Sequence, residues 1–204
     1  TQCHTVVTAI DGKKVKLKQT IFYAFSGGQE SDEGTIGGIK VLTATKQGDK
    51  ESIIDIEYEL ETEPAFSVGD TVEVAIDEEN RAKLRKLHSA AHIVYYFVIE
   101  KLGQLKVIGS NINSEKARMD FLYEKPISEL LQDIEVKVNH FLQENHEILR
   151  KQDEKNPDLW WWICGNWKMP CGGTHGKTTL EIGKLQLKRR NIGAGKERIE
   201  MMLA

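Results

Sequence analysis

The chain has 204 residues, of which 40% are hydrophobic, which is enough for one large or two small globular domains with buried cores. Its 28 Lys and Arg against 31 Asp and Glu give a formal net charge of −3, which does not indicate a general electrostatic binder of nucleic acid, so any such contact must be local. No apolar run reaches the roughly 18 residues of a membrane span, and the first residues do not form a signal peptide. We therefore expect a cytoplasmic protein with no membrane partner, and we assume a monomer.

From Thr5 to about Ile76, apolar and polar residues alternate with a period of two, which predicts short antiparallel strands. The alternation is clearest at Val15 and Leu17, at Ile54 and Ile56, and at Val72, Val74 and Ile76. Turn signals punctuate these segments at Asp11-Gly12, Gly48-Asp49 and Gly69-Asp70. The spacing is typical of a small β-barrel, which we place over residues 1–78.

After Asn80 the apolar spacing changes to that of a helix, and Gly103 supplies a natural C-terminal stop. A second helix is predicted over 126–155, ended by Asn156-Pro157. Strands are predicted over 106–112, 117–121, 160–163 and 179–187. The fold class is therefore α+β: a small N-terminal barrel domain, followed over 79–204 by a two-layer α+β domain with an antiparallel sheet and helices.

Two short motifs predict one metal site. His88 and His92 lie one helical turn apart, so both rings project from the same side of the first helix. Cys171 and His175 have the same spacing around Gly172-Gly173, where a tight turn also lets backbone amides approach a ligand closely. Imidazole and thiolate are the ligands that zinc prefers, and two such pairs from distant segments are a strong signal for Zn²⁺.

The role of this metal stays open on spacing alone. Four protein ligands are usual in a structural zinc site, whereas catalytic zinc keeps one position for water or substrate. A metalloprotease is excluded, because that motif needs a glutamate as general base where this chain has Ser89.

Two other features have alternative interpretations. The tryptophans at 160–162 and 167 favour packing over stacking on a nucleic acid. A cluster of cations near the end of the chain favours a solvated face over a nucleic-acid contact, and its members are Lys184, Lys188, Arg189, Arg190, Lys196 and Arg198. Cys164 is expected to be a small buried residue.

Taken in order, the motifs resemble the editing domain of alanyl-tRNA synthetases and the free-standing AlaX proteins, over nearly the whole chain. The resemblance is carried by the glycine-rich stretch at 22–34, by Arg85-Lys-Leu-His88-Ser-Ala-Ala-His92, by Cys171-Gly-Gly-Thr-His175 through Gly183, and by the segment 193–199.

This resemblance implies a zinc-dependent aminoacyl-tRNA deacylase that removes serine, or glycine, from mischarged tRNA(Ala) in trans. By position, the zinc ligands would be His88, His92, Cys171 and His175. The catalytic candidates are Gln29, Ser89 and Thr174, and the substrate-binding candidates are Gly27, Gly28, Gly172 and Gly173. A seryl group differs from an alanyl group by one hydroxyl. The aminoacylation site of a synthetase rejects this small difference poorly, so a second site that binds the hydroxyl discriminates serine from alanine.

Two uses of the zinc and two other identities remain open. The metal could activate a bound water or position the aminoacyl-adenosine, and four protein ligands favour the second. The chain could instead be an editing-domain fragment of an alanyl-tRNA synthetase, or a non-catalytic tRNA-binding module with structural zinc.

Overall fold

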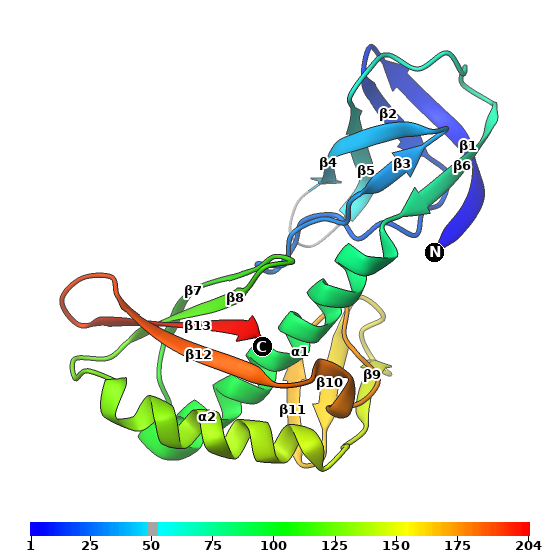
Figure 1. Ribbon diagram of the computed structural model, residues 1–204. Helices are drawn as coiled ribbons and strands as arrows, with labels where there is room; N and C mark the ends of the chain where they lie inside the picture. Colours follow the sequence, from blue (N-terminus) through cyan, green and yellow to red (C-terminus); the bar gives the residue numbers. More distant parts are fainter. Residues whose placement is uncertain (49–52) are drawn as a thin grey trace. The chain divides into compact units, whose positions relative to one another are not determined.

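The structure is a computed structural model that describes residues 1–48 and 53–204 (Figure 1). The chain divides into two compact units, the first comprising residues 1–26 and 30–81 and the second residues 27–29 and 82–204. Within the described residues, no helix combines the length and the apolar character needed to cross a membrane.

The first unit is a closed antiparallel barrel of six strands, in the order β1-β2-β5-β4-β3-β6, drawn in blue to cyan-green in Figure 1. The strands are β1 (Gln2–Asp11), β2 (Lys14–Leu17), β3 (Gly34–Ile36), β4 (Ile39–Gly48), β5 (Ile53–Leu60) and β6 (Thr71–Ile76). The pairing of β1 with β6 closes the sheet on itself, so no strand edge stays open. The prediction of a small barrel is confirmed.

Alternation places one face of each barrel strand in the core. Val15 and Leu17 on β2 and Val74 on β6 are buried, as the period-two pattern predicted. The predicted turns at Gly12 and Gly69 both have positive φ, which glycine adopts without strain. The third predicted turn, at Gly48-Asp49, lies partly outside the described residues.

The second unit combines helices with two antiparallel sheets, as expected for an α+β fold. One sheet has the strand order β12-β13-β8-β7 and the other the order β11-β10-β9. The elements are α1 (Glu78–Leu102), β7 (Val107–Ile112), β8 (Ala117–Leu122), α2 (Ser128–Gln143), β9 (Ile148–Gln152), β10 (Trp160–Cys164), β11 (Trp167–Pro170), the 3-10 helix η1 (Leu180–Ile182), β12 (Leu185–Asn191) and β13 (Lys196–Leu203).

Helix α1 confirms the prediction made for it, including its end at Gly103, whose φ is +79°. Acidic residues at its first turn complement the helix dipole. Its apolar stripe, which includes Leu84, Leu87 and Val94, is buried in the core of the second unit, so the residues between them are held at defined positions.

The second predicted helix is wrong beyond residue 143. Helix α2 ends at Gln143, Asn145 adopts a left-handed φ of +58°, and the chain turns back into β9, which pairs with β10. Asparagine tolerates this conformation better than most residues, so the turn forms without glycine. Leu149, which falls within the range predicted to be helical, lies in β9.

Strand predictions hold for β7, β8 and β10, within one residue at each end. The strand predicted over 179–187 is wrong at its start, because η1 occupies Leu180–Ile182 and Gly183, at a φ of +79°, precedes β12. Strands β9, β11 and β13 were not predicted.

Candidate metal centre

Helix α1 supplies the first half of a compact His and Cys cluster. His88 and His92 are one turn apart, and their rings stack with centroids 4.9 Å apart. His88 is only 4% exposed, and the His92 ring packs against the buried Trp162, with centroids 4.9 Å apart. The surrounding core thus fixes both rings on one side of the helix.

The loop after β11 supplies the second half. The Sγ atom of Cys171 lies 3.5 Å from Nε2 of His88 and 3.2 Å from Nε2 of His175. The ligand atoms of His88, His92, Cys171 and His175 all lie within 4.8 Å of one another. The four side chains predicted to share a metal are therefore gathered at one point.

These distances suit a tetrahedral zinc ion. Zn–N bonds of about 2.0–2.1 Å and Zn–S bonds of about 2.3 Å separate the ligand atoms of one tetrahedron by roughly 3.3 to 3.6 Å. The two distances from Cys171 fall close to this range. In addition, Nε2 of His92 is buried and has no hydrogen-bond partner among the described residues. A buried ring nitrogen without a partner is unfavourable unless it binds a cation.

The protonation states also fit metal binding. Burial lowers the pKa of His88 to about 4. Burial, followed by the charge of neighbouring histidines, places the pKa of His92 and of His175 well below the ordinary value. All three imidazoles are therefore neutral near pH 7, the form that donates a lone pair to a metal.

Burial raises the pKa of the Cys171 thiol, while a hydrogen bond from the Gly173 backbone and the charge of Arg150 act in the opposite direction. A bound cation would further favour the thiolate.

Gln29 connects the glycine-rich segment to both halves of the cluster. Its Oε1 accepts hydrogen bonds from Nδ1 of His88 at 2.7 Å and from the backbone N–H of Thr174 at 2.9 Å. Its Nε2 donates to Oγ1 of Thr174 at 2.8 Å. Because Gln29 is fully buried and His88 donates from Nδ1, Nε2 of His88 carries the lone pair that faces the cluster.

Ser89 makes similar contacts on the other side of the centre. The side chain is fully buried, its Oγ accepts a hydrogen bond from the Gly176 backbone at 3.1 Å, and it lies 3.4 Å from Nδ1 of His175. The described contacts of Ser89, Thr174 and Gln29 are thus with the protein around the candidate metal ligands. Their predicted contact with substrate stays a prediction.

The candidate glycines differ in what surrounds them. A Cβ on Gly173 would lie 2.1 Å from Cε1 of His88, and a Cβ on Gly28 would lie 2.5 Å from Oγ of Ser110. Gly27 and Gly172 have nothing within 4 Å of such an atom. Close packing against the histidine therefore requires glycine at 173, and Gly27 lines the cavity described next.

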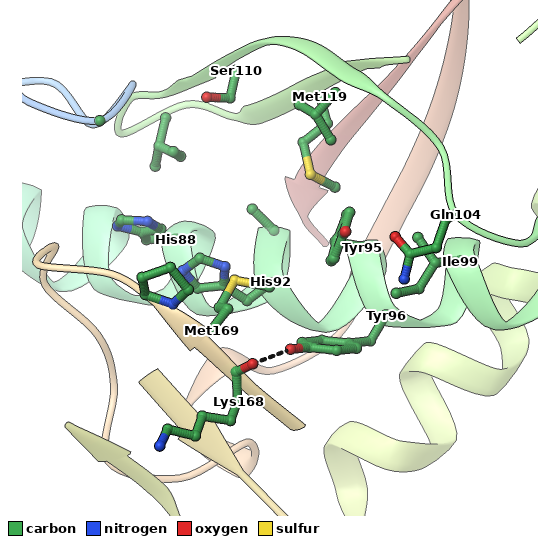
Figure 2. Close-up of a pocket in the computed structure, with 15 residues that line it drawn as sticks. His88, His92, Tyr95, Tyr96, Ile99, Gln104, Ser110, Met119, Lys168 and Met169 are labelled. Carbon is green, nitrogen blue, oxygen red and sulfur yellow. Dashed lines mark hydrogen bonds between the residues drawn. The ribbon is translucent and has the colours of Figure 1, made fainter. Parts of the chain in front are cut away.

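A cavity of about 470 Å³ opens beside the two helix histidines (Figure 2). It runs along α1 from His88 and His92 past Tyr95 to Ile99, residues that recur at helical spacing on one face. Most of its remaining lining is apolar, including Met119 and Met169, and Figure 2 shows Gln104 at the end away from the histidines. This lining was not predicted from the sequence, although the spacing of Tyr95 and Ile99 from the histidines signals a shared helical face.

The tryptophans serve mainly in packing. Trp162 is fully buried, and Trp167 stacks on Tyr96 with ring centroids 5.0 Å apart. Trp160 lies under the guanidinium of Arg150, which is 4.2 Å from the ring centroid and also donates to the carbonyl oxygen of Gly172.

Half of the C-terminal cation cluster is paired with carboxylates of its own sheet. Arg189 pairs with Glu197, Arg190 with Glu200, and Arg198 with Asp120. These pairs neutralise the arginines across β8, β12 and β13, so the cluster is neither a fully solvated face nor a continuous basic surface. Cys164 is buried, as expected.

Comparison with known proteins agrees with the motifs. The chain is 36% identical over 208 aligned residues to the alanyl-tRNA editing protein AlaX-M of Pyrococcus horikoshii, an alignment that covers 97% of this chain and 90% of that protein. The chain belongs to the alanyl-tRNA editing protein family. No family model matches it.

The chain is also similar to alanine–tRNA ligases, but only over one part of their length. The chain is 32% identical to an alanine–tRNA ligase of Campylobacter jejuni over 98% of its own length, which is 25% of the ligase. With an alanine–tRNA ligase of Methanococcus maripaludis it shares 30% identity, covering 92% of this chain and 23% of the ligase. The chain thus spans about a quarter of these ligases and nine-tenths of AlaX-M.

Proposed function

We propose that this protein hydrolyses the ester bond of mischarged tRNA(Ala) in trans, with seryl-tRNA(Ala) as its principal substrate and glycyl-tRNA(Ala) as a second one. Water adds to the ester carbonyl carbon, the bond to the ribose oxygen breaks, and this oxygen takes up a proton. The products are free serine and tRNA with an intact 3′ end.

The single observation that carries the proposal is the position of the His and Cys cluster at one end of a cavity. His88 and His92 belong to both, so an ester held at the cluster has room beside it for the rest of the substrate. Membership of the alanyl-tRNA editing family supports the choice of tRNA(Ala) over other esters.

We further propose zinc as the metal, held by His88, His92, Cys171 and His175. Zinc, when bound, supplies a positive charge that polarises the ester carbonyl and helps to position it. The chain's own groups then act in support: Gln29 orients the His88 ring, and Ser89 does the same for His175. With four protein ligands, positioning of the substrate is favoured over activation of a bound water.

The roles of the two regions follow from this assignment. We propose that residues 79–204 form the editing domain and residues 1–78 the accompanying barrel domain. Gly27 and Gly28 then contribute to the substrate-proximal loop from the glycine-rich segment. Backbone amides at Gly172 and Gly173 offer hydrogen bonds to the substrate.

The test measures zinc content and release of serine from seryl-tRNA(Ala) by the purified full chain. We expect about one zinc per chain, and we expect Cys171→Ala to lower both zinc affinity and deacylation at least tenfold. Cys3→Ala removes a thiol from β1, outside the cluster, and should leave both unchanged.

Alanyl-tRNA(Ala) provides the control for substrate choice, because an editing enzyme must spare the correct product. Full deacylation by Cys171→Ala would contradict the proposed centre. Stoichiometric zinc without any release of serine or glycine would instead identify a binding module with structural zinc.

A further inference from the structure

The cavity beside the metal centre is much larger than the amino acid that an editing site must recognise. Its volume of about 470 Å³ equals the bulk-water volume of roughly 15 water molecules. Along α1 it extends from His92 to Ile99, seven residues and therefore about 10 Å. A seryl side chain has a single hydroxymethyl group, so it would fill only the part next to the histidines.

The wall of the cavity favours a flat, uncharged ligand. Tyr96 is already fixed, because its ring stacks on Trp167 and its hydroxyl donates to the carbonyl oxygen of Lys168 at 2.8 Å (Figure 2). The Tyr95 ring meets Tyr96 edge to face, and the Tyr95 hydroxyl has no hydrogen bond within the part of the chain that is described. Tyr95, Ile99 and Met169 together offer an aromatic and aliphatic surface suited to a planar ring.

The ammonium group of Lys168, a residue that lines the cavity, is directed away from it (Figure 2). Lys168 lines the cavity, but its ammonium lies 4.2 Å from the centroid of the Trp161 ring, and Figure 2 draws its side chain leading away from the cavity. The cavity therefore offers little attraction to a phosphate, and its composition favours a neutral base over a phosphodiester.

Gln104 supplies the polar group at the far end. It lies just beyond the end of α1, it is exposed, and its side-chain amide has no protein partner among the described residues. A carboxamide offers a donor and an acceptor side by side, which matches N6 and N7 of adenine.

We propose that this cavity binds the adenosine at the 3′ end of the substrate, with adenine packed on Tyr95 and its edge hydrogen-bonded to Gln104. The ribose then points toward His88 and His92, where the ester lies. This inference rests on the proposed function, and it assigns the base, rather than the amino acid, to most of the cavity.

The experiment measures binding of adenosine to the zinc-loaded full chain by isothermal titration calorimetry, together with KM for seryl-tRNA(Ala). We expect adenosine to bind more tightly than uridine, because a purine covers more of the aromatic wall. Tyr95→Ala should weaken adenosine binding and raise KM about tenfold or more, whereas Tyr95→Phe should retain both, since the ring remains.

Gln104→Leu tests the polar end. It should remove the preference for adenosine over inosine, because inosine has a carbonyl where adenosine has the N6 amine. Ile99→Trp provides a variant that fills the cavity instead of emptying it. It should abolish adenosine binding while zinc content stays unchanged.

Matched controls come from the same unit. Tyr123→Ala alters a tyrosine in another cavity, and Gln186→Leu alters an exposed glutamine on β12, so neither should change adenosine binding. Undetectable adenosine binding at millimolar concentration, or unchanged binding in both Tyr95→Ala and Ile99→Trp, would overturn the inference. Adenosine binding without serine release would overturn the proposed function alone.

Discussion

Replacing Gly173 with alanine should displace His88, one of the four proposed metal ligands, while adding only one methyl group. The new Cβ would lie 2.1 Å from Cε1 and 2.5 Å from Nδ1 of His88, and 3.0 Å from Oε1 of Gln29. Ordinary contact begins at 3.4 Å, so the ring or the loop must move by about 1.3 Å. His88 is buried on α1, and its ring is also held by the hydrogen bond to Gln29. A shift of the ring therefore costs free energy.

The size of the effect follows from the tolerance of a zinc site. Ligand distances outside about ±0.2 Å of their ordinary values are not compatible with full coordination, and the required movement is several times larger. Loss of supporting contacts alone lowers metal affinity by 10- to 100-fold. We therefore expect Gly173→Ala to weaken zinc binding about 100-fold, equivalent to roughly 2.7 kcal/mol.

The assay is a competition titration of zinc against a chelator of known affinity, with Gly172→Ala as the matched control. Gly172 lies in the same turn, and a Cβ on it would meet nothing within 4 Å. Gly172→Ala should therefore bind zinc as the unaltered protein does. Equal affinities for the two variants would refute the claim that close packing on His88 requires glycine at 173.

Two further predictions concern the same centre. Gln29→Leu should lower zinc affinity by about 10- to 100-fold, since His88 loses the acceptor that holds its Nδ1–H; unchanged affinity in the chelator titration would exclude this orienting role. The second concerns the zinc-free protein, in which burial lowers the pKa of His88 to about 4 from 6.5. The unfolded chain then binds more protons between these values, so His88 alone should lower the free energy of unfolding by roughly 3 kcal/mol from pH 6.5 to pH 4. His92 and His175, whose pKa is also lowered by burial, act in the same direction. A free energy of unfolding that stays constant over this interval in denaturant titrations would contradict the prediction.

Local pattern was sufficient to predict that the four side chains of the His and Cys cluster come together. A pair of histidines on one helical face and a pair flanking two glycines each depend on a few neighbouring residues, and the ligand chemistry then links the pairs. The contacts of Gln29 depend on tertiary folding instead. Nothing in the local sequence indicates that its amide reaches both His88 and Thr174.

The errors in the fold have physical causes that a period analysis does not detect. Helix α2 ends at Gln143 although helical spacing continues, because Asn145 takes a left-handed conformation and β9 gains a partner in β10. Strand β13 was missed because Glu197 and Glu200 interrupt its apolar pattern. Both are buried, and their pairing with Arg189 and Arg190 on β12 stabilises charges that the pattern alone assigns to the surface.

The hydrogen bond between Gln29 and Thr174 joins residues that are 145 positions apart, and this separation governs the order in which a newly made chain can mature. The barrel strands all precede residue 77, so they leave the ribosome before Cys171 and His175 have been synthesised. Until then His88 and His92 have neither the thiol nor the third imidazole beside them, and the ring of His88 lacks part of the network that orients it. Capture of a metal by the proposed four-ligand site therefore has to wait until His175 has been made, and a nascent polypeptide stalled before residue 171 would carry the barrel strands with only His88 and His92 of that site.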